Sequence, residues 1–596
     1  MKNIKNQHDG HFLLAYVRPY SYLLCMAHLH KKIKKGRPYY YVREIARVDC
    51  KPKVINQVYL GSPERILEMA QGGGNAMPRK IQAQPFGALW LANLVEKEID
   101  LAGLVDEIVS LEKANIPSAG EYFLYAVYNR MIQGCSKRGM AGWYKATAIQ
   151  HIRPVKVDEL SSQMFWLKWD QVGEEQLRQI AHEFLGRISA IEPSSSGCFM
   201  FDTSNYYTFM ATDTESELAQ RGKSKEGRNW LRQVGIALLV SRDKGIPLYY
   251  REYEGNRHDS KVFLQTMEDM FRAMRDFVGK DADLTVVFDK GMNSEANIAA
   301  IDTRENINFI TTYSTHHADH LVHIDLGEFK PVNSRRNQNL ARQGRKDDQL
   351  LAWRTQGEYW GRERTVVVTY NPLTATKQRY SFEKKMLRLQ DSLFEFQSRV
   401  NRNTPHWRKE SVVLKRYKDI CSELHIPSNL YKVEFYHNDN RLRMNFRKNH
   451  YRIGRYINRF GKNILITNII NWTTDEIVQA SLDRWAVEDS FRLTKNETQV
   501  ALRPIRHWTD SKIRCHIFTC IAALALLRII ELRLRKAGVD ITARTAMKSM
   551  HRLHSCLIWL PGKRKAVRML EEPDDIQAEI MRAFGWKIAG GVLQKI

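Results

Sequence analysis

The sequence predicts an α/β protein in which helices flank a mixed β-sheet and a large basic α+β insertion interrupts that sheet. Three observations support this fold class. Strand-like and helix-like runs alternate after residue 197, a long helical pattern precedes them, and a basic segment separates the last strand–helix pair from the rest. Hairpin-like strands followed by strand–helix alternation are typical of a mixed sheet with helices on both faces.

The N-terminal part begins with strands and continues with helices. Residues 36–66 predict two strands joined by a polar turn at residues 49–53. Residues 86–191 show apolar side chains at helical spacing, and the segment "IEPSSSG" after them has the composition of a linker. We therefore expect a β-hairpin and a mainly helical region before the sheet.

The predicted sheet follows the linker. Its first strands are "CFMFDTS", "YYTFM", "VGIALLVS" and "IPLYYREYEG". A helix over residues 261–278, the buried strand "LTVVF", the helix "SEANIAAIDT" and the strand "NINFITTYS" complete the first half. This order predicts a mixed sheet with helices on its faces.

A basic region then changes the order of elements. It contains the helical stretch "FEKKMLRLQDSLFEFQSRV" and the strand-like runs "RTVVVTY" and "YKVEFYH", before "GKNILITNI" restores a buried strand and residues 472–497 predict one long helix. We interpret the basic region as an insertion, although a continuous second domain would also fit. The predicted divisions are residues 1–190, 191–320, 321–460 (the insertion), 461–536 and a helical C-terminal tail, 537–596.

The overall charge indicates a polyanionic partner. Across 596 residues, 92 Lys and Arg against 66 Asp and Glu leave a formal net charge of +26. A folded chain this basic usually binds nucleic acid, since a polyanion neutralises the excess charge. A generic basic surface or a membrane-surface protein is the alternative.

Neither a membrane span nor a disulfide framework is expected. The most apolar run, residues 517–527, ends at Arg528 and is shorter than the about 20 residues that a span needs. The N-terminal "FLLAYV" is short and lacks a signal-peptide cleavage site. The eight cysteines are scattered without a C-x-x-C pair. We expect a cytoplasmic protein with reduced thiols.

Two aspartates each follow a buried strand. Asp202 ends "CFMFD" and Asp289 ends "LTVVFD". In α/β sheets, functional groups gather beyond the strand ends, so the two carboxylates would lie close together if their strands are neighbours. Two adjacent anions are costly unless a cation neutralises them, and Mg²⁺ prefers carboxylate and phosphate oxygens. The simpler alternative is that each aspartate caps a turn.

A glutamate joins them from the late helix. On an ideal helix Glu488 shares a face with Ser481, Arg484, Arg492 and Lys495, because their offsets are within about 40° of it. One carboxylate among three cations fits a phosphate-handling face. A solvated face with ion pairs such as Arg484 with Glu488 is the alternative.

At these residues the sequence resembles the bacterial insertion-sequence DDE transposases of cut-and-paste type. Arg484-x₃-Glu488-x₆-Lys495 is similar to their Tyr-x₂-Arg-x₃-Glu-x₆-Lys signature, with Ser481 at the tyrosine position. "FDTSNYYTF", "VVFDKGMNS", "LRPIRHWTDSKIRCHI" and the stretch from "RGKSKEGRNW" to "EGNRHD" resemble further segments of the family. The likeness covers most of the chain.

The resemblance implies an RNase H-like core in which Asp202, Asp289 and Glu488 are catalytic and hold two Mg²⁺ ions, with Mn²⁺ able to substitute. Arg484, Lys495 and Arg492 would bind DNA phosphates. It further implies double-stranded DNA partners (transposon ends and target DNA), cleavage by water, strand transfer by a DNA 3′-OH, a homodimer on paired ends, and a bacterial, nucleoid-associated location. The N-terminal region and the insertion would recognise DNA. A related nuclease without strand transfer, or a catalytically silent DNA-binding descendant, are the rivals.

Two further motifs have ordinary explanations. Asn256, His258 and Asp259 in "EGNRHD" could lie near the site, although turn chemistry is as good an explanation and a zinc site is weakly supported. Trp508 could stack on a base, although a core position at the start of the next helix is the better expectation.

Overall fold

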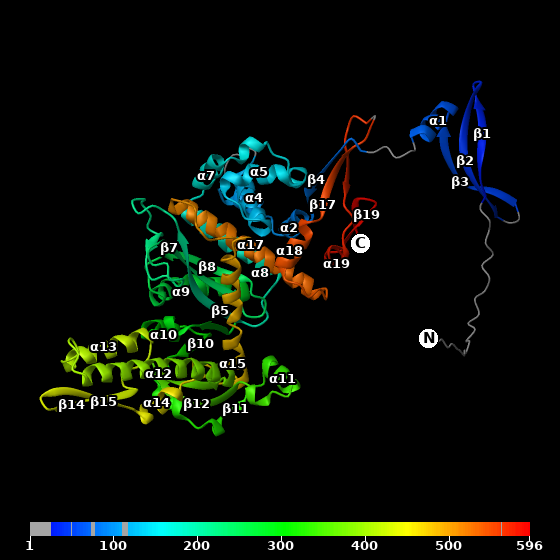
Figure 1. The fold of residues 1–596 in the computed structure, drawn as a ribbon. Coiled ribbons are helices and arrows are strands. Elements are labelled where there is room, and N and C mark those ends of the chain that lie inside the picture. Colours follow the sequence, from blue (N-terminus) through cyan, green and yellow to red (C-terminus); the bar gives the residue numbers. More distant parts are fainter. Residues whose placement is uncertain (1–25, 49–50, 73–77, 110–116, 280, 562) are drawn as a thin grey trace, which may run out of the picture. The chain divides into compact units, whose positions relative to one another are not determined.

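The computed structural model describes residues 26–48, 51–72, 78–109, 117–279, 281–561 and 563–596 (Figure 1). The chain forms two compact units. Residues 1–83 and 556–569 belong to one, and residues 84–555 and 570–596 to the other. The first strands of the chain and the catalytic residues predicted above therefore belong to different units.

The first unit contains a three-stranded antiparallel sheet of β1 (Met26–Lys34), β2 (Arg37–Val48) and β3 (Lys51–Gly61), followed by α1 (Pro63–Gly72). The predicted pair of strands is confirmed as β2 and β3, and β1 is an additional strand that pairs with β2 along its whole length. A second three-stranded sheet has the order β18 (Val567–Leu570), β17 (His554–Trp559), β4 (Lys80–Pro85).

The helical prediction for residues 86–191 is confirmed. The helices are α2 (Gly87–Glu96), α3 (Leu101–Val109), α4 (Ala119–Ile132), α5 (Met140–Ala146), α6 (Ile149–Ile152), α7 (Ser162–Asp170) and α8 (Glu174–Ile191). Ser118 shows why α4 starts where it does: its side chain accepts from the Glu121 amide while the Glu121 carboxylate accepts from the Ser118 amide, a reciprocal cap.

A ten-stranded mixed sheet forms the centre of the second unit. Its order is β11-β12-β13-β16-β10-β9-β5-β7-β6, and β8 also pairs with β7. The strands are β5 (Cys198–Thr208), β6 (Gln220–Arg221), β7 (Arg232–Ser241), β8 (Pro247–Glu254), β9 (Leu284–Phe288), β10 (Ile307–Tyr313), β11 (Lys330–Pro331), β12 (Leu351–Tyr359), β13 (Arg362–Tyr370) and β16 (Lys462–Thr467). The predicted runs "CFMFDTS" and "YYTFM" join in one strand, β5.

The arrangement β8-β7-β5-β9-β10 is RNase H-like. β5, β7 and β8 are antiparallel neighbours, while β9 and β10 run parallel to β5. The prediction of an α/β protein with a mixed sheet is confirmed. Because β9 lies directly beside β5, Asp289, just beyond the end of β9, is a neighbour of Asp202. Asp202 itself lies within β5 and not at its end, so the expectation that it follows a strand is wrong, because β5 continues to Thr208 in its pairing with β7.

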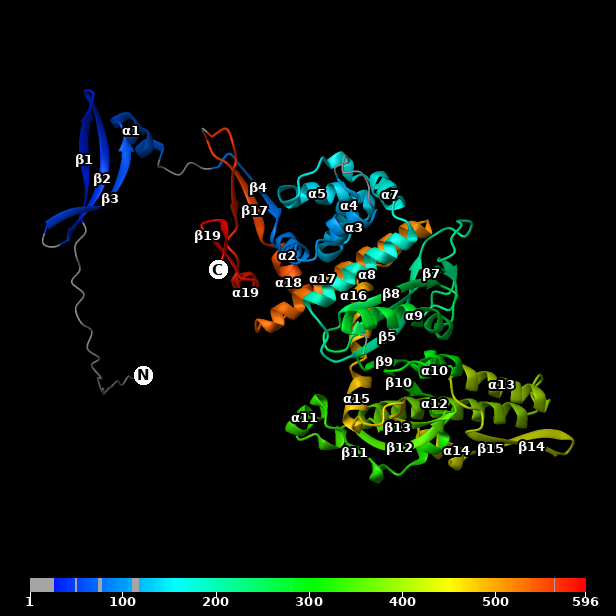
Figure 2. The same ribbon diagram turned by 180° about the vertical axis from the view of Figure 1, so that it is seen from behind.

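The two faces of the sheet pack against different helices. Phe199 and Phe201 of β5 join one hydrophobic cluster with α9 (Asp259–Val278) and α10 (Glu295–Asp302). Cys198 and Met200 join the other cluster with α16 (Trp485–Thr494) and α17 (Asp510–Lys536), and Figure 2 shows α17 beside α8. Because side chains alternate along a strand, Asp202 faces the side of α16.

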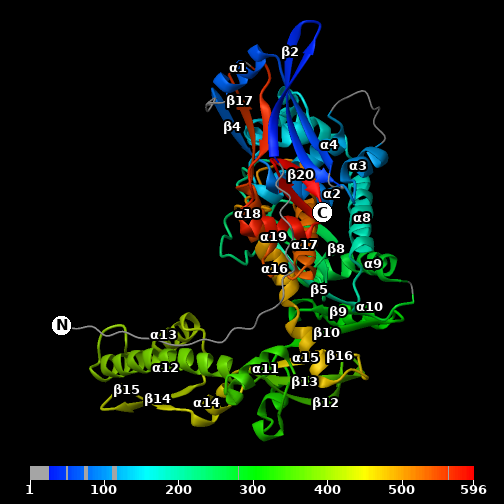
Figure 3. The same ribbon diagram turned by 90° about the vertical axis from the view of Figure 1, so that its right-hand side faces the viewer.

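The predicted insertion contains two kinds of structure. β11, β12 and β13 lie within residues 321–460 yet extend the central sheet. The remainder builds a hydrophobic core of its own from α12 (Pro372–Asn401), α13 (Glu410–Glu423), β14 (Tyr431–Asn438), β15 (Arg441–Lys448) and α14 (His450–Ile457), which lie together in Figure 3. A short helix, α11 (Arg335–Arg342), precedes β12. The central sheet thus continues past the predicted boundary at residue 320. The division of the chain into five regions stays a prediction.

The single helix predicted over residues 472–497 is wrong. α15 (Thr474–Leu482) ends at Asp483, and α16 starts after Arg484. The Asp483 carboxylate accepts from Arg242 Nε at 2.7 Å and from Gln479 Nε2 at 2.7 Å, which ties the junction to the end of β7. The calculated alignment of Ser481 with Glu488 therefore does not hold, because the two lie on different helices.

The helical prediction for residues 537–596 holds for α18 (Ala543–His551) and α19 (Asp575–Ala583) but misses four strands. Besides β17 and β18, these are β19 (Trp586–Ala589) and β20 (Val592–Lys595). Gly590 and Gly591 have φ of 59° and 74° and form the tight turn between the last two. Strands of four residues are too short to show a periodic pattern.

α17 is long and apolar enough to cross a membrane, but 94% of its apolar window is buried within the protein. It packs against α4, α7 and α8 and serves as a core helix. Its Arg528, which ended the apolar run in the sequence, is buried and ion-paired.

Candidate active site

Asp202 lies on β5 where the strand passes the start of α16. Its Oδ1 accepts a hydrogen bond from the Thr203 amide at 2.8 Å. Burial raises the pKa of Asp202, and the neighbouring charge of Asp289 raises it further, although Lys225 and Arg484 oppose this change. An effect of Asp289 on the pKa of Asp202 is expected for two carboxylates on neighbouring strands.

Asp289 lies just beyond the end of β9. The Thr312 hydroxyl, on neighbouring β10, donates to Asp289 Oδ1 at 2.8 Å, and an Arg484 nitrogen lies 3.1 Å from the same oxygen. Burial raises the pKa of Asp289, but the Thr312 hydrogen bond and the Arg484 charge outweigh it and bring the pKa below its usual value. Asp289 is therefore a carboxylate that cations stabilise.

Arg484 joins the carboxylates. It is the residue that precedes α16, and its guanidinium contacts Asp289 at 3.1 Å and Glu488 at 3.2 Å. Asp202 also contributes to the raised pKa of Arg484, although burial lowers that pKa. Arg484 thus contacts Asp289 and Glu488 and is influenced by the charge of Asp202, whereas the sequence predicted a DNA phosphate as its partner.

Asp202 and Glu488 also line a pocket of about 580 Å³ with four cations. Its other walls are Thr203, Ser204, Lys225, Phe491, Arg492, Lys495, Asn496 and Arg503. Two of the three predicted phosphate-binding residues, Arg492 and Lys495, are therefore in this pocket, whereas the third, Arg484, pairs with the carboxylates. An open, cation-lined pocket beside carboxylates suits a nucleic-acid phosphate.

Lys495 is positioned by an acidic partner. Its Nζ lies 3.3 Å from Glu226 Oε1, and Arg503 contacts the same oxygen at 2.6 Å. Arg503 Nε also donates to the Lys495 carbonyl at 2.9 Å. Burial lowers the pKa of Lys495, with Arg503 and Lys225 adding to the effect and Glu226 opposing it. This crowding of positive charge favours an incoming anion.

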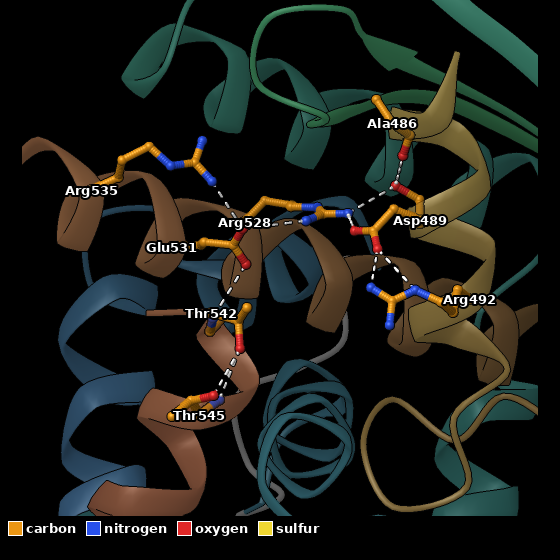
Figure 4. A network of polar contacts seen from close by, with 10 residues as sticks. Ala486, Asp489, Arg492, Arg528, Glu531, Arg535, Thr542 and Thr545 are labelled. Carbon is orange, nitrogen blue, oxygen red and sulfur yellow. Dashed lines mark hydrogen bonds and ion pairs between the residues drawn. The ribbon is translucent and has the colours of Figure 1, made fainter. Parts of the chain in front are cut away.

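Arg492 takes part in a different network (Figure 4). It pairs with Asp489, which also pairs with the buried Arg528 of α17. Arg528 in turn lies 3.7 Å from Glu531. The side chain of Arg492 is 73% exposed, so one face of it remains available to the pocket.

Sequence reasoning missed Lys225, Glu226, Arg503 and Thr312. Lys225 Nζ donates to the Thr203 carbonyl at 2.7 Å and lies 3.4 Å from Asp259. The signal for it was present, since "RGKSKEGRNW" places a basic turn just before β7. Thr312 had no signal, because its role depends on the pairing of β10 with β9.

The "EGNRHD" motif divides between two places. Asp259 reaches the active site through Lys225, while Asn256 and His258 line a separate pocket of about 690 Å³. Trp508 is 62% exposed, so the expectation of a core position is wrong. The side chain that packs inward at this point is His507, whose ring centroid lies 5.5 Å from that of Trp169.

The donor set fits Mg²⁺ in its chemistry. Three carboxylates supply the hard oxygen ligands that this ion prefers, and the repulsion between Asp202 and Asp289 is the kind that a divalent cation relieves. The described residues contain no group of three or more His, Cys, Asp or Glu side chains that could hold a metal ion in the conformation seen here. Arg484 supplies the cation that two of the carboxylates contact here.

A family model described as "Transposase DDE domain" matches residues 208–526, more than half of the chain. The chain belongs to the DDE transposase family. The matched range contains Asp289 and Glu488 and begins after Asp202. A comparison with curated proteins finds no match.

A comparison with solved structures finds a piggyBac transposase in a cryo-EM structure of its synaptic complex with hairpin DNA. The match has 9% sequence identity and a TM-score of 0.35. It covers 79% of the present chain and 82% of the piggyBac transposase chain. So low a TM-score says nothing further about function.

Proposed function

We propose that this transposase cuts and joins DNA at the ends of its own mobile element, a bacterial insertion sequence with terminal inverted repeats. The observation that carries this proposal is the convergence of Asp202, Asp289 and Glu488 around Arg484, beside a pocket lined by cations. Asp289 and Glu488 lie within the range that matches the DDE transposase domain, and Asp202 lies shortly before it.

In the proposed reaction Asp202, Asp289 and Glu488 hold two Mg²⁺ ions, and Mn²⁺ substitutes for them. Bound there, such ions activate a nucleophile and stabilise the leaving oxygen in an in-line phosphoryl transfer. The nucleophile is water for cleavage and a DNA 3′-OH for strand transfer.

The protein's own groups bind and orient the DNA. Lys495, Arg492 and Arg503 bind phosphates next to the cut from the pocket wall, because a guanidinium can grip a phosphate with two hydrogen bonds and lysine attracts it as a point charge. Thr312 orients the Asp289 carboxylate, and Arg484 keeps the carboxylates together until DNA arrives. The protein acts as a homodimer on paired ends, in the bacterial cytoplasm.

The test is a cleavage and joining assay on the DNA that flanks the coding region, with Mg²⁺. We expect the parent to cut at the repeat ends and join them to a target duplex, and Asp289→Asn to bind but not cut. Asp283→Asn, an exposed aspartate before the opposite end of β9, should cut like the parent. Equal cutting by Asp289→Asn would overturn the assignment, and cutting without joining would identify a nuclease.

A further inference from the structure

The sheet β1-β2-β3 has two faces of opposite chemistry. Cross-strand pairs join Lys34 with Arg37, Lys32 with Tyr39, His30 with Tyr41 and His28 with Arg43. Along its other edge β2 pairs with β3, where Tyr41 lies opposite Tyr59 and Arg43 lies opposite Gln57. Because paired residues share a face and neighbours along a strand alternate, these ten side chains form one surface, which we call the basic face.

Contacts between side chains confirm that they share this surface. Arg43 Nε donates to Gln57 Oε1 at 2.7 Å. The ring of Tyr59 lies 5.0 Å from that of Tyr41 and 6.1 Å from that of Tyr39, centroid to centroid. Desolvation lowers the pKa of His30, and the positive charges of Arg43, His28 and Lys32 lower it further.

The opposite face differs in kind. It carries Leu29, Ile33, Val42 and Val58, and its charged side chains are of both signs: Lys31, Lys53 opposite Ala46, and Glu44 paired to Asn56. None of the ten residues of the basic face is Asp or Glu. A merely solvated face would mix charges of both signs, so the segregation of positive charge indicates an anionic partner.

The shape and hydrogen-bonding groups of the basic face favour duplex DNA. Three strands about 4.8 Å apart span about 10 Å, which matches a major groove about 12 Å wide. The ring of Tyr59 packs against those of Tyr39 and Tyr41, so part of each ring is covered by a neighbouring ring. A single strand would instead require open rings on which its bases stack.

We propose that the basic face of β1–β3 binds duplex DNA in the major groove. Lys32, Lys34, Arg37 and Arg43 contact phosphates, and the tyrosine hydroxyls and Gln57 approach base edges. These residues lie outside the range matched by the transposase domain, which assigns them no role. That this DNA is the end of the mobile element rests on the proposed function.

Adjacent lysines on opposite faces provide the test. Lys31 and Lys32 are both exposed, and each replacement by Gln removes one charge. The binding of full-length Lys32→Gln and Lys31→Gln to the flanking DNA is measured from 50 to 200 mM salt. We expect Lys32→Gln to reduce the slope of log affinity against log salt by about 0.9 and to weaken binding roughly tenfold at 100 mM salt, and Lys31→Gln to match the parent.

Equal effects of the two variants, or none, would overturn the proposal. A loss in Lys32→Gln that is as large on the single strands as on the duplex would also overturn it, because that result identifies a stacking platform. The comparison of the two lysine variants measures only DNA binding, so it remains valid if the parent protein fails to cut. Failure of the proposed function appears instead in the cleavage assay with Asp289→Asn.

Discussion

Arg503 shows how a single side chain acquires its role from distant parts of the chain. It contacts Glu226, 277 positions away in sequence, and the backbone carbonyl of Lys495. These two contacts hold its guanidinium at the wall of the pocket that Asp202 and Glu488 also line. We expect it to bind a DNA phosphate there, because Glu226 neutralises only one of the two cations that it contacts.

At this scale, Arg503→Gln should weaken binding to the flanking DNA roughly tenfold at 100 mM salt and reduce the salt slope by about 0.9, since one phosphate contact is lost. Titration of labelled DNA at several salt concentrations measures both quantities. Arg506→Gln, an exposed arginine three residues away that does not line the pocket, is the control. The assignment fails if both variants change the slope equally.

α16 carries Glu488, and its position depends on a buried ion pair. Asp489, next to Glu488, pairs with Arg528 of α17, whose side chain is only 7% exposed. Arg492 covers the other side of Asp489 (Figure 4). Since α17 is a buried core helix of this unit, the pair joins the helix that carries Glu488 to the hydrophobic core.

At the element scale, Asp489→Asn should lower the free energy of unfolding by about 3 kcal/mol, because the buried Arg528 charge keeps only its longer contact with Glu531. Arg528→Met should cost less, since Asp489 keeps Arg492 as a partner. Adding Arg528→Met to Asp489→Asn should restore much of the loss, and thermal or urea unfolding of the three variants measures this. A double variant as unstable as the sum of the single ones would show that the pair does not act as a unit.

The net charge of +26 acts on the whole molecule. We expect it to attract DNA regardless of sequence, and the release of counterions to make that binding dependent on salt. In the proposed reaction the carboxylate site requires a divalent ion, and we expect it to contribute nothing to this long-range attraction.

At the scale of the molecule, binding to any duplex should weaken by on the order of 10³-fold or more between 50 and 200 mM salt, as expected for at least six phosphate contacts. Removal of Mg²⁺ with EDTA should abolish cutting while it leaves this salt-dependent binding in place. Parallel gel-shift and cleavage measurements on one DNA fragment separate the two effects. Binding that disappears together with Mg²⁺ would contradict this division.

Much of the fold was predictable because its signals are local. The buried strands β7 and β9, the helices α9 and α12 and the aspartate that ends β9 each follow from apolar periodicity over a few residues. The break at Asp483 and the strands β19 and β20 were missed. The break at Asp483 depends on a contact with Arg242, just beyond the end of β7, and the strands β19 and β20 are too short to show a periodic pattern.

The sequence by itself determined the basic charge, the α/β class, and the identity and order of the carboxylates Asp202, Asp289 and Glu488, because composition, spacing and motif are properties of the chain alone. Only the tertiary structure decided which groups surround them. β9 had to lie beside β5 before the two aspartates could meet, and α16 had to pack on the same face before Arg484 could join them. Such neighbours are set by strand pairing and helix packing between segments far apart in sequence, and no local pattern encodes that choice.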